Sequence, residues 1–308
     1  MYRVRYSVHG TPYTELQGTP SARFAGHWAG GPPTLHVYRV PYTLGGEPRL
    51  IIAVCNQKGG VGKTTTVANL GVALAEQQRR VLLLDFDPQG SLTISFGLDP
   101  AELSGTTVYE GVVLLESDPH HRALASVIRR TRFGVDLAPA DIDLAAAEID
   151  LVGQISREMA LARALRTVRG QYDYILIDTP PSLGLLTLNA MAAASHVIIP
   201  LATNFLSTKG VQALLRTVHL VRERLNPDLD VAGILATMHE GHKTHHAEVL
   251  EATRNAFAGH IRVFDAVIKR SVRFEEAPVD GIPAVIYARD LDGARAYRAL
   301  ALEVAALA

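Results

Sequence analysis

The sequence contains one cysteine, Cys55, among its 308 residues. A single cysteine excludes an intrachain disulfide framework and any metal or cluster site built on paired cysteines. Cys55 lies at the end of a short apolar run, so we expect a buried small hydrophobic residue rather than a reactive thiol. No apolar run reaches the roughly 18 residues that a membrane helix needs, and no signal-peptide pattern is present. We therefore expect a cytoplasmic protein with no membrane partner.

An excess of charge of either sign is also missing, since 30 Lys and Arg residues face 31 Asp and Glu residues and the net charge is −1. Without a general basic field, any binding to nucleic acid must use a local patch. The composition, with 48% hydrophobic, 20% charged and 6% aromatic residues, is ordinary for a globular protein. The length allows one large α/β domain with a full core, or two small domains.

A glycine-rich stretch follows the first strand that the sequence predicts, residues 50–54. Apolar residues at helical spacing after Thr64 predict that a helix begins there. A strand, a glycine-rich turn and a helix in this order form a cradle for phosphate, because backbone N–H groups and the helix N-terminus surround the anion. Lys63 is expected to reach the β- and γ-phosphates, and the Thr64 hydroxyl to hold Mg²⁺. The predicted nucleotide-binding residues are Lys58, Gly59, Gly60, Val61, Gly62, Lys63, Thr64 and Thr65.

Two later apolar runs end in aspartates. Residues 81–84 lead into Asp85 and Asp87, and residues 174–177 lead into Asp178. The carboxyl ends of parallel strands are where α/β sheets bind ligands. Asp178 has the placement of a carboxylate that binds Mg²⁺ through water. The segment after it, residues 179–181, is predicted to sense the γ-phosphate as a switch.

These three motifs together resemble those of the deviant Walker A ATPases, the group that contains ParA, MinD and the nitrogenase iron protein. The extra lysine at the loop entrance, Lys58, and the Asp-x-Asp-Pro-Gln-Gly run at residues 85–90 carry the resemblance, which covers about Leu50 to Ala308. It implies that Lys58 crosses a dimer interface to the partner subunit's nucleotide. It also implies that Asp87 positions the attacking water and that Asp85 supports Mg²⁺ through solvent.

The resemblance implies a ParA-type partitioning ATPase that uses ATP and Mg²⁺. ATP would join two subunits into a homodimer, the dimer would bind DNA non-specifically on the nucleoid, and a ParB-like partner would stimulate hydrolysis. Two alternatives keep the same loop: a MinD-like regulator of division or polar placement, which the tail disfavours because it lacks a lysine-rich amphipathic helix, and an ATP-dependent amide-forming synthetase. A nucleotide-independent DNA-binding scaffold is opposed by the intact carboxylate motifs.

Candidate DNA contacts are Lys269, Arg270 and Arg273, which form the best local basic cluster, with Lys243 second. Each also has a plainer interpretation as part of a solvated surface. The histidine-rich run at residues 239–246 has metal-ligand spacing, but we expect solvated histidines there because no buried carboxylate or cysteine partner is evident.

The alternation of predicted strands and helices from Leu50 onward indicates an α/β domain over residues 49–308. We expect a doubly wound, mostly parallel sheet with helices on both faces, as in phosphate-loop NTPases. Residues 1–48 are rich in Gly, Pro, Thr and Tyr without regular patterning, so they are predicted to be a poorly ordered extension or an over-long start. The predicted later strands are residues 135–140, 197–200 and 231–236, and the predicted later helices are residues 156–169, 210–225 and 293–307.

Overall fold

The computed structural model describes residues 4–6, 12–14, 50–114, 123–203, 208–240 and 244–308. The chain divides into two units, Met1–Thr43 and Leu44–Ala308. In the first unit, β1 (Val4–Tyr6) and β2 (Pro12–Thr14) pair in antiparallel fashion. Apart from these two strands, the predicted poorly ordered extension lies outside the described residues.

The second unit is built on an eight-stranded sheet with the order β10-β9-β8-β3-β7-β4-β6-β5. Every pairing is parallel except that of β5 with β6. The strands are β3 (Leu50–Val54), β4 (Val81–Asp85), β5 (Arg129–Arg130), β6 (Asp136–Ala138), β7 (Tyr174–Asp178), β8 (His196–Ala202), β9 (Asp230–His239) and β10 (Val263–Lys269). The chain crosses from β3 to β4 on one side and later returns to β8 on the other side of β3. This doubly wound, mostly parallel sheet confirms the predicted fold class.

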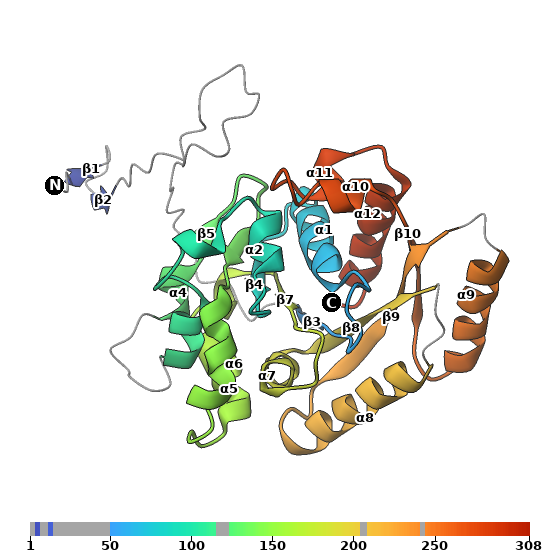
Figure 1. Ribbon diagram of the computed structural model, residues 1–308, viewed down its shortest axis with the longest axis horizontal. Coiled ribbons are helices and arrows are strands. Elements are labelled where there is room, and N and C mark those ends of the chain that lie inside the picture. The colour runs from blue at the N-terminus through green and yellow to red at the C-terminus, as the bar shows by residue number, and fades with distance from the viewer. Residues whose placement is uncertain (1–3, 7–11, 15–49, 115–122, 204–207, 241–243) are drawn as a thin grey trace. The chain divides into compact units, whose positions relative to one another are not determined.

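Helices cover both faces of the sheet, with α1 and α12 on one face and α6, α7 and α8 on the other (Figure 1). The helices are α1 (Lys63–Glu76), α2 (Ser91–Ser95), α4 (Leu124–Val127), α5 (Ala147–Asp150), α6 (Ala160–Leu165), α7 (Leu185–Ala193), α8 (Thr208–Arg224), α9 (Thr244–Phe257), α10 (Arg273–Glu276), α11 (Ala284–Tyr287) and α12 (Asp292–Ala305). No described helix has the length and apolar character needed to cross a membrane.

The two faces of the sheet explain why the strands read as continuous apolar runs. In β7, Ile175 and Ile177 pack in the cluster that includes α6, α7 and α8. Their neighbours Tyr174 and Leu176 pack in the cluster that includes α1 and α12. Successive side chains of a strand point to opposite faces, so a sheet covered on both faces needs apolar residues at every position. The same alternation holds in β4.

The strand register brings the polar ends of three strands together. Val54 of β3 pairs with Asp178 of β7, and Asp178 pairs with Asp85 of β4. The predicted phosphate loop continues directly from Val54, so it begins beside Asp178 and one strand away from Asp85. The carboxyl edge of the sheet therefore gathers the motifs that the sequence places about 30 to 120 residues apart.

One predicted helix was wrong in extent. Residues 156–169 form a 3₁₀ turn at Arg157–Met159, the short helix α6, and a second 3₁₀ turn that begins at Arg169. The helix ends at Leu165 because Thr167 bonds back through its hydroxyl to the Ala164 carbonyl at 2.8 Å and Gly170 follows. The strand predicted over residues 135–140 is also shorter, and the sequence reasoning did not identify α7, α9 or β10.

Candidate nucleotide and magnesium site

The phosphate loop has the backbone that its glycines were predicted to allow. Gly60 and Gly62 adopt left-handed conformations, with φ of 68° and 85°, which L-residues with a Cβ rarely occupy. Gly62 caps α1 without any side-chain hydrogen bond, so the first N–H groups of a 14-residue helix are not capped by a side chain. A Cβ on Gly59 or Gly60 would meet no atom within 4 Å. The space beside Gly59 and Gly60 is therefore open, and N–H groups at a helix N-terminus are suited to bind an anion.

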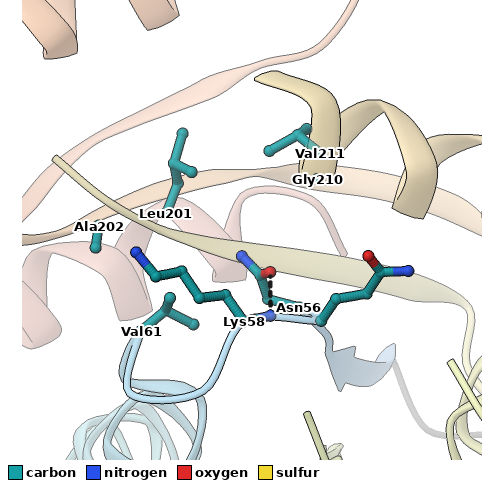
Figure 2. A pocket seen from close by; sticks show the side chains of 8 residues that line it. Asn56, Lys58, Val61, Leu201, Ala202, Gly210 and Val211 are labelled. Carbon is teal, nitrogen blue, oxygen red and sulfur yellow. Dashed lines mark hydrogen bonds between the residues drawn. The ribbon is translucent and has the colours of Figure 1, made fainter. Parts of the chain in front are cut away.

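The two lysines of the loop have different surroundings. Lys63 is buried, and its Nζ donates a hydrogen bond to the Lys58 carbonyl at 3.4 Å. Burial lowers the pKa of Lys63, while the charges of Asp178 and Asp87 oppose that change. Lys58 is exposed. It lines a pocket of about 200 Å³ together with Val61 of the loop and with residues of β8 and α8, among them Leu201 (Figure 2). The charge of Lys63 thus lies near the carboxylates, whereas the Lys58 side chain extends along the pocket toward Leu201 and Ala202 (Figure 2).

Asp178 is the clearest indication of a cation. Its carboxylate is fully buried, and neither oxygen has a hydrogen-bond partner among the residues that the structure describes. Burial, and then the charge of Asp85, raise the pKa of Asp178 well above its usual value, although the nearby Thr64 hydroxyl opposes this in part. Buried carboxylate oxygens are normally satisfied, and Mg²⁺ prefers oxygen ligands such as carboxylates. The unpaired oxygens of Asp178, close to the Thr64 hydroxyl, fit a divalent cation.

Asp85 has a different environment from Asp178. Its Oδ2 accepts hydrogen bonds from the Thr93 backbone N–H at 2.8 Å and from the Thr93 hydroxyl at 2.7 Å. Its Oδ1 accepts a long bond from the Asp87 N–H at 3.4 Å. Burial raises the pKa of Asp85 to about 6. Asp85 therefore fixes the turn that follows β4, and its predicted support of Mg²⁺ would come from the remaining capacity of Oδ1.

Asp87 sits on that turn, largely buried, with Oδ1 accepting from the Gln89 N–H at 3.0 Å. Thr93, the residue that bonds to Asp85, was not predicted from the sequence. No sequence motif indicates this role of Thr93, because a threonine eight residues after an aspartate is not a distinctive pattern. Its role depends on α2 folding back over the end of β4.

Two other predicted residues lie at the base of the loop. The Thr179 hydroxyl donates to the Val54 carbonyl at 2.8 Å and so ties the start of the predicted switch segment to β3. Cys55 is fully buried, and burial raises the pKa of its thiol to about 12. The burial of Cys55 agrees with the expectation of a buried small hydrophobic residue.

A family model described as "AAA domain" matches residues 49–231. The sporulation initiation inhibitor protein Soj of Bacillus subtilis is 45% identical over 257 residues, which are 83% of this chain and 98% of Soj. The chain belongs to the ParA/Soj family of phosphate-loop proteins. The chromosome partitioning protein ParA of Caulobacter vibrioides is a further relative, 41% identical over 85% of this chain and 96% of its own length.

Solved structures of ParA/Soj-like folds agree with this family. Cobyrinic acid a,c-diamide synthase of Mycobacterium smegmatis, solved with bound ADP and magnesium, is 43% identical, with a TM-score of 0.70 over 82% of this chain and 91% of that chain. The septum site-determining protein MinD of Pyrococcus horikoshii, complexed with Mg-ADP, is 28% identical, with a TM-score of 0.67 over 82% of this chain and 95% of that chain.

For this ParA/Soj family member, the described candidate DNA-binding residues lie at the end of β10, directly after it and at the start of α10. All three described candidates are exposed, and each forms an ion pair with a carboxylate. Lys269 pairs with Asp292 at 2.8 Å, Arg270 with Glu240 at 3.5 Å and Arg273 with Glu276 at 2.7 Å. The structure gathers these cations but partly neutralises them, which the sequence pattern did not indicate. Lys243 lies outside the described residues.

The expectation of solvated histidines in the histidine-rich run is wrong for one residue. His246 at the start of α9 is buried, contrary to the expectation of solvated histidines. Its Nδ1 accepts a hydrogen bond from the Glu240 N–H at 3.1 Å and lies 3.1 Å from the Thr203 hydroxyl. His239 contacts the same hydroxyl at 3.3 Å. His246 therefore connects the ends of β8 and β9 to α9. The run of histidines around it in the sequence did not indicate this structural role.

Proposed function

We propose that this chain is an ATPase of the ParA/Soj type, which binds ATP with Mg²⁺ and hydrolyses it. ATP would join two copies face to face, and the dimer would bind DNA non-specifically on the nucleoid. A ParB-like partner would stimulate hydrolysis and so release the DNA. The observation that carries the proposal is the meeting of the open phosphate loop, buried Lys63 and the unpaired carboxylate of Asp178 at one edge of the sheet. The names of the Soj and ParA relatives support the partitioning role.

Each residue of the site has a chemical task in this proposal. Lys63 and the N-terminus of α1 would bind the β- and γ-phosphates in place of the Lys58 carbonyl that Lys63 now contacts. Thr64 and Asp178 would hold Mg²⁺, which neutralises charge on the phosphates when it is bound. Asp87 would orient the attacking water, and Lys58 of the second copy would bring a cation to the charge that develops on the γ-phosphate.

The switch between DNA-bound and free forms follows from the γ-phosphate. Contacts with the γ-phosphate exist only in the ATP state, so only that state gains the binding energy that draws two copies together. A dimer doubles any basic patch, and a chain of net charge −1 needs this doubling to displace enough counterions from DNA.

An amide-forming synthetase is a second candidate, favoured by the similarity to the diamide synthase structure. A synthetase that takes nitrogen from glutamine calls for an activated nucleophile such as a thiolate. Cys55 is the one cysteine of the sequence, and it is buried with a raised pKa. This chain therefore lacks a thiol for that chemistry, and the partitioning role is better supported.

The test measures DNA binding by the purified protein with ATP, with ADP and without nucleotide, at a fixed salt concentration, together with ATP turnover in the presence and absence of DNA. We expect binding with ATP only, and turnover that rises on adding DNA. A MinD-like regulator or a synthetase should hydrolyse ATP at a rate that DNA does not change. Binding that is equal in all three nucleotide conditions would contradict the proposed switch.

A further inference from the structure

The side chain of Asn56 is buried at the point where the chain leaves β3 and enters the predicted phosphate loop. One residue earlier the backbones of β3 and β8 are still joined, because the Cys55 N–H donates to the Ile198 carbonyl at 3.0 Å. At the next step the Asn56 side-chain Nδ2 donates to the Pro200 carbonyl at 2.6 Å. The amide therefore takes the place of a backbone donor and continues the contact between the two strands while the main chain turns into the loop.

The other polar atom of the same amide holds the entrance of the loop. The Asn56 Oδ1 accepts a hydrogen bond from the Lys58 backbone N–H at 3.0 Å, shown as a dashed line in Figure 2. An asparagine that bonds the backbone two residues later forms a short, defined turn. The Lys58 side chain then extends toward Leu201 and Ala202 of β8, the strand to which Asn56 is tied (Figure 2). The amide thus fixes both the turn and the strand beside which Lys58 lies.

Two contacts hold the backbone of Lys58, and nucleotide binding should affect them differently. The Lys58 carbonyl accepts a hydrogen bond from the Lys63 Nζ at 3.4 Å. In the proposed function, on which this inference rests, Lys63 binds the phosphates and gives up that contact. The bond between the Lys58 N–H and Asn56 uses neither the Lys63 side chain nor the N–H groups of α1, so it would remain. The influence of Asn56 on Lys58 is therefore greatest when nucleotide is bound.

The middle of the loop has a separate anchor. The hydroxyl of Thr237, near the end of β9, donates to the Val61 carbonyl at 2.9 Å in a buried position. Loss of the Asn56 amide should therefore loosen the entrance of the loop, while the segment from Val61 to the start of α1 keeps its own support. A long exposed lysine side chain has many conformations, so its placement depends on how firmly its backbone is held.

We propose that Asn56 is a positioning residue for Lys58, and that through Lys58 it acts on the nucleotide of the second copy in the dimer rather than on the nucleotide of its own chain. The amide holds the backbone from which the Lys58 side chain crosses to the other subunit. Asn56→Ala should therefore reproduce the loss of Lys58. Nucleotide binding to the monomer should be unchanged, and ATP turnover should fall by about tenfold or more.

The experiment mixes two impaired variants, so that a complete site forms only in a mixed dimer. Asn56→Ala is combined with Asp87→Ala, which should bind ATP and dimerise but lacks the group proposed to orient the water. In a mixed dimer, the Asn56→Ala chain keeps its own Asp87 and receives a correctly placed Lys58 from the other chain. We expect ATP turnover several-fold above the sum of the two variants measured alone. Lys58→Ala mixed with Asp87→Ala is the positive control and should recover in the same way.

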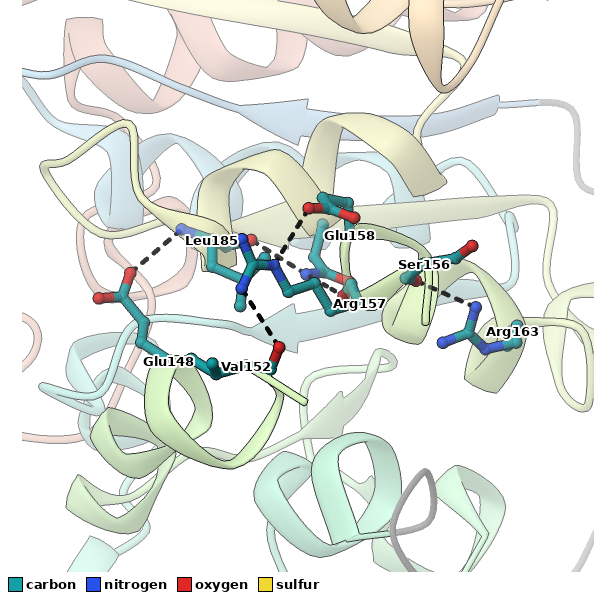
Figure 3. Close-up of polar contacts among 8 residues, drawn as sticks. Glu148, Val152, Ser156, Arg157, Glu158, Arg163 and Leu185 are labelled. Carbon is teal, nitrogen blue, oxygen red and sulfur yellow. Dashed lines mark hydrogen bonds and ion pairs between the residues drawn. The ribbon is translucent and has the colours of Figure 1, made fainter. Parts of the chain in front are cut away.

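Asn189→Ala is the matched negative control. Asn189 is also a buried asparagine whose amide bonds to the backbone, since its Nδ2 donates to the carbonyls of Arg157 and Leu185, both at 3.0 Å; Figure 3 shows these two residues. Its loss acts on the stability of its own chain, so mixing with Asp87→Ala should not restore any turnover that it loses. Thermal melting checks that each variant is folded. Asn56→Ser, which also lacks the Nδ2 donor, replaces Asn56→Ala if that variant does not fold.

The mixtures separate a failure of this inference from a failure of the proposed function. If Lys58→Ala recovers on mixing and Asn56→Ala does not, the amide acts only within its own chain and the positioning role is wrong, while the proposed function stands. Weaker binding of a fluorescent nucleotide by Asn56→Ala alone would also overturn the positioning role, because the phosphate-binding part of the loop would then be disturbed. If neither mixture recovers, Lys58 does not act across the dimer, and the proposed function fails at that contact together with the inference.

Discussion

Asp178 is costly to bury as an ion, since its oxygens have no hydrogen-bond partner within the described part of the chain and Asp85 is its neighbour across the strands. The pKa of Asp85 is raised to about 6 and that of Asp178 is raised well above its usual value. Without a cation, the folded chain therefore holds protons that the unfolded chain has already released above about pH 4. The free-energy cost of keeping Asp85 and Asp178 ionised in the folded chain without a cation therefore depends on pH.

The pH dependence of stability follows from these shifts. Because the folded state binds more protons than the unfolded state, the metal-free protein should lose stability as the pH rises from about 4 through 6. Chemical denaturation at pH 5 and pH 7.5, with and without Mg²⁺ and nucleotide, measures this loss. We expect Asp178→Asn to flatten the dependence and Mg²⁺ with nucleotide to reduce it. The same slope in wild type and Asp178→Asn would show that the pair does not contribute.

Lys63→Ala should weaken nucleotide binding by about a hundredfold or more, a loss of about 3 kcal/mol. Lys63 is the buried lysine at the start of α1, and no other described lysine has that position. Lys58→Ala is the matched control, because Lys58 is exposed and should leave binding to the monomer unchanged while abolishing ATP-dependent dimerisation. Titration with a fluorescent nucleotide measures the first effect, and light scattering the second. Wild-type affinity in Lys63→Ala would contradict the assignment of the loop.

Asp87→Ala should stop hydrolysis while ATP binding persists, so that the ATP-bound dimer accumulates. The Asp87 side chain accepts a hydrogen bond from the Gln89 N–H of its own turn, and the proposed phosphate loop is a different segment of the chain. Single-turnover release of phosphate decides the question. Release at the wild-type rate would mean that another group orients the water.

At the scale of elements, the sequence predicted what depends on local pattern. The phosphate loop was predicted from its glycine-rich turn, and β4 and β7 were predicted from apolar runs that end in aspartates. The predicted type and order of these three elements were correct. The sequence reasoning missed features that depend on distant packing. The bond from Thr93 to Asp85 needs α2 to fold over β4, and the carboxylate partners of Lys269 and Arg270 come from α12 and the end of β9. The burial of His246 likewise depends on how α9 meets β8 and β9.

The connection between α2 and β4 can be tested through Thr93. Its hydroxyl donates to Asp85 and accepts from the Ala140 N–H at 3.0 Å, all in a buried site. Thr93→Val leaves both partners short of a bond, so it should lower the free energy of unfolding by about 2 kcal/mol. Thr93→Ser keeps the hydroxyl and should lose less. Urea denaturation measures both, and a smaller loss in Thr93→Val than in Thr93→Ser would show that the methyl group, not the hydroxyl, stabilises the site.

At the scale of the whole molecule, several exposed arginines of the described residues form ion pairs with carboxylates. Arg222 of α8 pairs with Asp230 of β9, and Arg254 pairs with Glu251 within α9. Arg270 and Arg273 form similar ion pairs near α10. Exposed pairs of this kind contribute at most about 1 kcal/mol each. DNA phosphates can therefore compete for the arginines at little cost, provided that many bind at once.

DNA binding should accordingly require ATP and fall steeply with salt. The slope of log K against log salt concentration reports how many phosphates are neutralised, and an ATP-dependent dimer doubles that number. Changing Arg270 and Arg273 together to Glu should abolish DNA binding and its stimulation of hydrolysis, while ATP-dependent dimerisation persists, since the nucleotide residues lie on other elements. The control changes Arg222 and Arg254 to Glu, which alters the net charge equally at paired, exposed arginines elsewhere. If both double variants lose the same affinity, general charge governs binding. If the first keeps the wild-type affinity and salt slope, the DNA-binding surface lies elsewhere on the dimer.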